Sequence, residues 1–287
     1  MSDILQIAVG TVTMRPYVFA FFAAFLLAAV PHLGWRRVGV FTVIGYLISF
    51  ASEVSSINTG FPYGWYYYID RTSTKELWIA GVPFFDSLSY VFLCYCSYAT
   101  ALFILSPLKW ARWQLLPLET CAIRKSFAAL FLGSLLQAYL DIIIDPVSLQ
   151  GSRWFLGQIY GYRDQGHHFG VPLSNYLGWW LVSAAMIFAL QRLAASVREA
   201  KKPPAGVGFF PFSPLIGPIL YLSVLAFNLT IATVIGEMTI AVTGLFIVFL
   251  PLALVVTLAL RRVNRYTKDE LAAHLRDFPW SPAAGRQ

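Results

Sequence analysis

Seven apolar runs, separated by Gly, Pro and charged residues, are the feature that most limits what this chain can fold into. An α-helix of about 20 apolar residues crosses the roughly 30 Å hydrocarbon core of a lipid bilayer. The runs cover residues 17–30, 38–52, 83–105, 126–145, 172–190, 214–235 and 239–260, and the first two are the shortest. They predict an all-α fold, a polytopic membrane helical bundle of about seven transmembrane helices.

The composition leaves little material for a soluble domain. Apolar residues make up 58% of the 287 residues and charged residues only 12%, the reverse of the balance that a solvated surface requires. We therefore expect one transmembrane domain, residues 1–265, and a short cytoplasmic C-terminal tail, residues 266–287. The first residues carry no basic cluster before an apolar run, so they do not resemble a cleaved signal peptide.

The basic residues predict how the bundle is oriented, because loops on the cytoplasmic side of a membrane collect Lys and Arg. With the N-terminus outside and the C-terminus inside, the inner connections carry 16 of the 21 Lys and Arg residues and the outer ones five. The net charge of +7 then reflects topology and gives no reason to expect nucleic-acid binding. The same topology puts two long connections, residues 56–82 and 146–171, on the outer side, where they can meet over the bundle.

Acidic residues within the spans are the main candidates for function, since ionisable groups in hydrocarbon are costly and usually face a cavity or a partner. Gln137, Asp141 and Asp145 recur every four residues, which places them on one helical face. The stripe leads to Asp145-Pro146, where we expect the helix to break. A purely structural interpretation, in which hydrogen bonds tie the acids to neighbouring helices, stays open.

A second polar group is expected at the same outer level. It consists of Ser49, Ser52, Glu53 and Ser56 at the end of one span and Asp86, Ser89 and Tyr90 at the start of the next. The nearby loop puts six aromatic residues into positions 61–68. Such residues concentrate at membrane interfaces, and their faces can also line an apolar pocket and stabilise a cation.

Some functions are disfavoured by what the sequence contains. All six Lys residues lie outside the predicted spans, which excludes a retinal Schiff base of the rhodopsin kind. Cys94, Cys96 and Cys121 have no metal-ligand or redox spacing and are interpreted as small apolar packing residues. No metal site is expected.

Four segments between Glu53 and Trp180 form an ordered set of motifs. They are NTGFPYG at 58–64, GVP at 81–83, DP at 145–146 and HFGVPLSNYLGWW at 168–180. In this order they resemble the membrane carotenoid biosynthesis family, whose characterised members are C-1',2' carotenoid hydratases of the bisanhydrobacterioruberin and γ-carotene type. His168 departs from the pattern, which has Tyr at that position, and the change is expected to alter hydrogen bonding near the site.

The resemblance implies a hydro-lyase that adds water to the terminal C1',2' double bond of an acyclic carotenoid ψ-end, giving a tertiary alcohol without a cofactor. Such a reaction needs a carboxylic acid to protonate the alkene and a second carboxyl group to accept a proton from water. The expected acid and base are among Asp141, Asp145 and Glu53, and the sequence does not decide which of them has which role. The expected substrate-binding residues are Asn58, Tyr63, Tyr67, Asp86, Trp154, His168, Asn175 and Trp179.

Two other functions stay open on the sequence alone. End-group cyclisation of an isoprenoid shares the protonation step, and a membrane transporter also needs buried acids, although a conduit would need polar residues in both leaflets. The expected partners are a carotenoid dissolved in the membrane, the lipid bilayer and other enzymes of carotenoid synthesis, with no nucleic acid. The expected location is the inner, cytoplasmic membrane of a bacterial cell.

Overall fold

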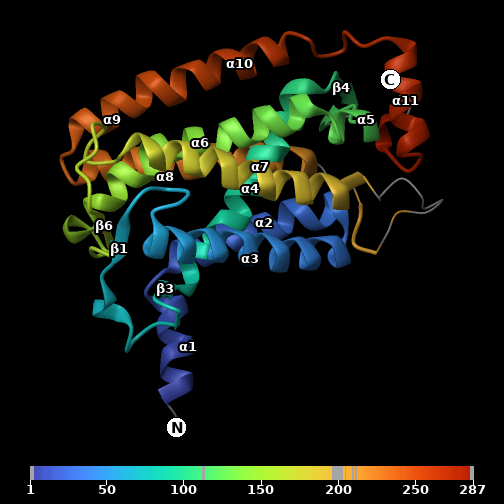
Figure 1. The fold of residues 1–287 in the computed structure, drawn as a ribbon. Helices are drawn as coiled ribbons and strands as arrows, with labels where there is room; N and C mark the ends of the chain where they lie inside the picture. Colours follow the sequence, from blue (N-terminus) through green and yellow to red (C-terminus); the bar gives the residue numbers. More distant parts are fainter. Residues whose placement is uncertain are drawn as a thin grey trace.

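The computed structural model describes residues 3–111, 114–195 and 212–284, together with residues 203, 205–208 and 210. Seven helices in this part of the chain are long and apolar enough to cross a membrane, which confirms the predicted all-α polytopic bundle (Figure 1). Six of them are α2 (Pro16–Leu33), α3 (Trp35–Thr59), α4 (Phe84–Leu105), α6 (Phe127–Leu149), α7 (Leu173–Ala195) and α8 (Ile216–Val234). The seventh joins α9 (Met238–Gly244), a π-helical turn (Leu245–Phe249) and α10 (Leu250–Leu260). The second run was predicted to cover only residues 38–52, but the corresponding helix α3 is the longest of the described spans at 25 residues.

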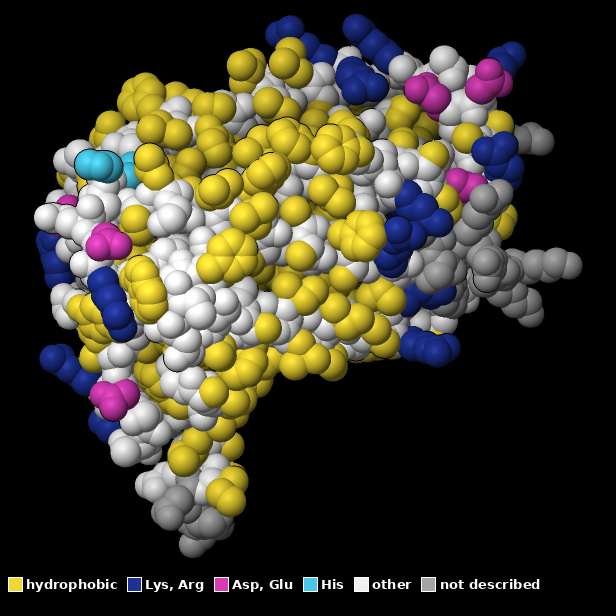
Figure 2. All heavy atoms as spheres, in the orientation of Figure 1, with side chains coloured by type: hydrophobic (Ala, Val, Ile, Leu, Met, Phe, Trp, Pro, Cys, Tyr) yellow, Lys and Arg dark blue, Asp and Glu magenta, His cyan; other side chains and the backbone are white. Residues whose placement is uncertain are grey.

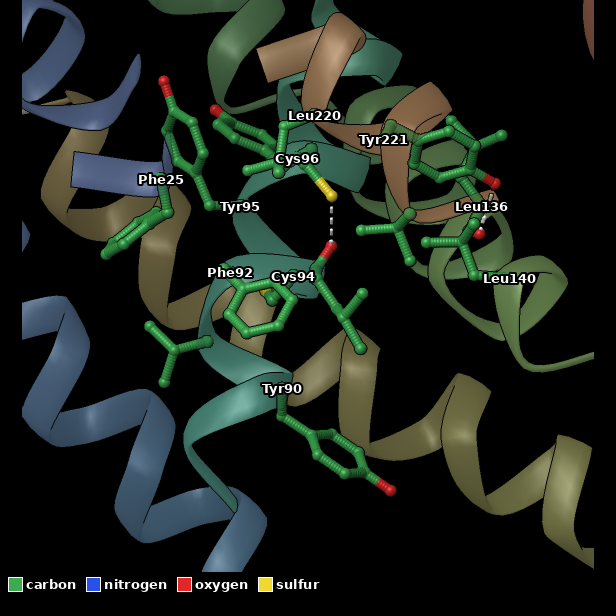
Figure 3. Packing of buried hydrophobic residues seen from close by; sticks show 14 of the residues in the cluster. Phe25, Tyr90, Phe92, Cys94, Tyr95, Cys96, Leu136, Leu140, Leu220 and Tyr221 are labelled. Atoms are coloured by element: carbon green, nitrogen blue, oxygen red, sulfur yellow. Dashed lines mark hydrogen bonds between the residues drawn. The ribbon is translucent and has the colours of Figure 1, made fainter. Parts of the chain in front are cut away.

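Helix α4 forms the centre of the bundle. In its most apolar window 83% of the residues are buried, against 28 to 50% in the other six spans. Its apolar side chains pack on α2, α6 and α8, and Figure 3 shows Tyr95 lying beside Phe25 of α2. Cys94 and Cys96 are buried free thiols in this core, as expected of small packing residues.

The helix break expected at Asp145-Pro146 is wrong, since α6 continues through Pro146 to Leu149. A proline inside a helix leaves the carbonyl four residues earlier without its N–H donor, and here that carbonyl belongs to Ile142. The Nε2 of His168 lies 3.1 Å from this oxygen and, because a carbonyl can only accept, donates a hydrogen bond to it. A side chain from a distant loop therefore satisfies the backbone group that Pro146 frees, as continuation of a helix in lipid requires.

The two long connections meet at one end of the bundle, as the sequence predicts. Strand β1 (Tyr66–Tyr68) pairs antiparallel with β6 (Tyr160–Tyr162), and the two lie side by side in Figure 1. A short hairpin of β2 (Trp78–Ile79) and β3 (Val82–Pro83) leads into α4. We call this the loop end of the bundle. The amphipathic helix α1 (Asp3–Thr13) joins the bundle at this end through its last residues, and its N-terminus points away from the bundle (Figure 1).

The opposite end, which we call the C-terminal end, carries a compact group of short elements. They are β4 (Leu108–Ala111), β5 (Gln114–Pro117), α5 (Cys121–Arg124) and α11 (Lys268–Asp277). Helix α11 is tied to the loop before α5 by a hydrogen bond of 2.6 Å between the Nδ1 of His274 and the carbonyl of Glu119. The predicted tail is thus a helix folded against the bundle.

The surface follows the pattern of a membrane protein. In Figure 2 hydrophobic side chains cover the middle of the visible face, and charged side chains lie at the two ends, with Lys and Arg gathered beside α11. A bilayer around the apolar middle would place the loop end on one side and the C-terminal end on the other. That the C-terminal end lies inside the cell stays a prediction.

Candidate active site

A cavity of about 110 Å³ lies at the loop end, among α2, α3, α4, α6, α7 and α8. Three carboxyl groups line it, from Glu53 of α3, Asp86 of α4 and Asp145 of α6. Glu53 and Asp145 are buried and Asp86 is partly buried, although their helices are apolar. Acids from three helices therefore converge on one cavity near one end of the bundle, an arrangement typical of a functional site in a membrane protein.

Asp145 is held by three donors that reach both of its carboxyl oxygens. Tyr160 donates its hydroxyl to Oδ1 at 2.8 Å, while Tyr162 donates its hydroxyl to Oδ2. Asn175 of α7 donates through Nδ2 to the same Oδ2 at 2.8 Å and to Oδ2 of Asp141 at 2.6 Å. The amide Nδ2 of Asn175 can only donate, whereas hydroxyls can also accept, so this obligatory donor on Oδ2 favours the ionised, proton-accepting form of Asp145.

The other two carboxyl groups have different partners. Glu53 accepts hydrogen bonds from the hydroxyls of Ser49, at 3.1 Å, and Ser87, at 2.9 Å. A serine hydroxyl can donate to an ionised carboxylate or accept from a protonated one, so this setting suits either form of Glu53. Asp86 accepts a bond of 2.5 Å from the hydroxyl of Tyr68.

Tyrosines from the β1–β6 pair form the roof of the cavity. Successive residues of a strand point to opposite faces, so Tyr66 and Tyr68 face the cavity whereas Tyr67 faces away and is 45% exposed. On β6 the same alternation turns Tyr160 and Tyr162 inward.

These roof hydroxyls stay neutral over the physiological range. Burial raises the pKa of Tyr160 well above its ordinary value, and the neighbouring Asp145 charge adds to this. Burial and the Asp86 charge do the same for the pKa of Tyr68. The roof tyrosines therefore act as hydrogen-bond donors and not as charged bases.

Aromatic rings supply most of the remaining wall. Tyr90 of α4 stacks on Trp179 of α7, with ring centroids 4.3 Å apart. Tyr63 is buried next to Tyr90, and Trp154 is fixed by its indole N–H, which donates to the carbonyl of Val147 at 3.2 Å. The electron-rich faces of such rings can stabilise a positive charge that develops in the cavity.

The structure brings together most of the residues predicted for the site. Glu53, Tyr63, Asp86, Asp145, Trp154, Asn175 and Trp179 line the cavity. Four predicted residues do not line it. Asn58 and Tyr67 are exposed, and His168 binds the Ile142 carbonyl. Asp141 lies outside the cavity and accepts a hydrogen bond from Asn175, which lines it. In the described part of the chain no group of three His, Cys, Asp or Glu side chains could hold a metal ion.

Sequence reasoning missed the residues that bind the carboxyl groups directly. They are Ser87, Tyr68, Tyr160 and Tyr162, and Tyr66 lines the cavity beside them. The available signal was the Tyr-x-Tyr alternation at 66–68 and again at 160–162, which is typical of strands that present every second residue to one face.

Fold and site together define an integral membrane protein: the described residues include seven helices long and apolar enough to cross a bilayer and an aromatic cavity lined by three carboxyl groups. Comparison with protein-family models then identifies the family. A model described as carotenoid biosynthesis protein matches residues 12–251, and the chain belongs to this family. Comparisons with curated proteins and with solved structures gave no significant match. The chain therefore has a role in carotenoid biosynthesis, as the motifs between Glu53 and Trp180 indicated.

Proposed function

We propose that the protein is a hydro-lyase that adds water to the terminal C1',2' double bond of an acyclic carotenoid ψ-end. The observation that carries the proposal is the convergence of Glu53, Asp86 and Asp145 on one aromatic cavity. Membership of the carotenoid biosynthesis family supports the substrate class. The carboxyl groups of the cavity support hydration, because this reaction needs only a proton donor, a proton acceptor and water.

The hydrogen bonds favour a division of roles between two of the acids. Glu53, whose serine partners suit either form, gives its proton to C2' of the alkene and leaves a tertiary cation at C1'. The oxygen of a water molecule then bonds to C1', and Asp145 takes the proton that this water loses. Return of that proton from Asp145 to Glu53 through solvent completes the cycle, with H and OH added to the alkene.

The surrounding residues assist these steps in two ways. Tyr63, Tyr90 and Trp179 present ring faces and edges to the reacting end group, and a ring face is worth about 0.5–2 kcal/mol to a nearby cation. Asp86, held by Tyr68, adds a negative charge near the same end of the cavity when it is ionised.

The size of the cavity suits one end of an elongated substrate. At about 110 Å³ it is smaller than the cavity of roughly 150 Å³ that holds benzene in an engineered protein. We infer that an isoprenoid end group enters while the rest of the polyene stays in the hydrocarbon of the bilayer.

The test is expression in cells that accumulate a ψ-ended acyclic carotenoid, followed by mass analysis of the pigments. The proposal predicts products heavier by one water for each converted end, and loss of conversion in Glu53→Gln and Asp145→Asn. Asp164→Asn is the matched control: this aspartate is exposed in the loop after β6, outside the cavity, and the variant should convert normally. An isomer of unchanged mass would indicate cyclisation instead, and unaltered pigments would contradict the enzyme proposal.

A further inference from the structure

We propose that the protein holds an ordered internal water between α6 and α7, bound by Gln137, Asp141 and Ser183. This site lies outside the cavity, on the side of Asp141 that faces the C-terminal end. The inference does not depend on which reaction the cavity performs.

Two rows of residues facing each other place these three side chains together. On α6 the row Asp145, Asp141, Gln137 and Gly133 recurs every four residues, and on α7 the row Asn175, Trp179, Ser183 and Ile187 does the same. Asn175 contacts Asp145 at 2.8 Å, and the Cδ1 of Ile187 lies 2.9 Å from the point where a Cβ on Gly133 would stand. The two contact points are twelve residues apart on each helix, Asp145 to Gly133 on α6 and Asn175 to Ile187 on α7. The antiparallel register between the helices is therefore the same at both points. Ser183 therefore lies opposite Gln137.

The polar atoms of this group have no protein partner in the described part of the chain. They are Oε1 and Nε2 of Gln137, Oδ1 of Asp141 and Oγ of Ser183. None of these three residues has any exposed surface. The one near donor, Nδ2 of Asn175, is used by Oδ2 of Asp141 and by Asp145.

Four polar atoms without a hydrogen-bond partner, on adjoining helical turns, would destabilise the fold if nothing bound them. An unsatisfied polar group is costly in any apolar interior and more so within a membrane, where no solvent can replace the bond. Buried waters typically make about three hydrogen bonds to such groups. One water can accept from Nε2 of Gln137 and from the hydroxyl of Ser183 while it donates to Oδ1 of Asp141 and to Oε1 of Gln137.

The site connects to the cavity through the acid pair. Asp141 and Asp145 share the Nδ2 of Asn175 as a common donor, so a water on the free oxygen of Asp141 extends the same network. Asp141 is in this view a positioning residue, which orients Asn175 and through it Asp145. A role in keeping Asp145 ready to accept a proton would rest on the proposed hydration, whereas the water itself does not.

Thermal unfolding of the purified full-length protein gives a test in which the sign of the shift decides. Replacing Gln137 by the apolar, similarly sized Met removes two water ligands, and we expect the Tm to fall by about 2–4 °C. Gln191→Met is the matched control, because Nε2 of that buried glutamine donates to the carbonyl of Ser126 at 3.0 Å and its loss should also lower the Tm. If Gln137→Met raises the Tm or leaves it unchanged, Gln137 has no partner and the proposal is overturned.

Infrared difference spectra between H₂¹⁶O and H₂¹⁸O add a readout that a change in packing would not move. The wild type should show an O–H stretching band that shifts with the heavier oxygen. That band should disappear in Gln137→Met and in the smaller change Ser183→Ala, but persist in Gln191→Met. A spectrum identical in wild type and Gln137→Met would overturn the proposal. Because no substrate is present, failure here is separate from failure of the hydratase assignment.

Discussion

The bond between His168 and the Ile142 carbonyl makes a quantitative prediction about stability. His168→Phe keeps a ring in place but removes the Nε2 donor, which lies 3.1 Å from the oxygen that Pro146 leaves without a backbone partner. A carbonyl that loses its donor where water cannot replace it costs about 1–3 kcal/mol, and this partly buried bond lies within a helix that is expected to span the bilayer. In a protein of this size each kcal/mol lowers the Tm by roughly 2–4 °C, so a fall of several degrees is expected.

A double-mutant cycle with Pro146→Ala isolates this bond. Alanine at 146 restores the N–H that can donate to Ile142, so the carbonyl no longer needs the imidazole. His168→Phe should then cost less in the Pro146→Ala background than in the wild type, by at least 1 kcal/mol. The assay is thermal unfolding of the four purified variants. Equal Tm shifts in both backgrounds would refute the reasoning.

Three further predictions follow from other contacts. Gly178→Ala should lower both the Tm and the turnover, because its Cβ would come within 2.7 Å of the Pro62 carbonyl; Gly39→Ala, which meets no atom within 4 Å, should not. Asn175→Leu should abolish conversion, because it removes a hydrogen-bond donor from Asp145. Pigment analysis tests this, and hydrated product formed by the variant would contradict it. Burial lowers the pKa of His274 below its usual 6.5, so the docking of α11 is fully stable above pH 6.5 and weakens as the pH falls below it. Proteolysis of α11 should then be faster at about pH 5.5 than at pH 7.5, and a rate that does not change with pH, or that changes equally in His274→Gln, would contradict this.

Much of the fold could be predicted from the sequence, because a bilayer imposes a length and an apolar composition on every span. The extension of α6 beyond Asp145 could not be predicted in this way. Proline at 146 normally ends a helix, and the residue that compensates, His168, comes from another segment of the chain. No local pattern reveals that contact.

The candidate site was predicted in part for a similar reason. Acids such as Glu53 and Asp145 stand out because charges are rare in spans. Their partners do not stand out, since Tyr68 and Tyr160 belong to loops about 90 residues apart that pair as strands only in the folded protein. Tyr67 was expected to contact substrate, but the strand alternation turns it outward.

The most direct measurement of the central claim is the origin of the oxygen in the product. Purified protein in lipid vesicles that contain an acyclic carotenoid would be incubated in H₂¹⁸O without added oxidant or cofactor. Hydration by Glu53 and Asp145 predicts a tertiary alcohol whose hydroxyl carries ¹⁸O, formed by the wild type and not by Asp145→Asn. A product without ¹⁸O, or an equal yield from Asp145→Asn, would contradict the account.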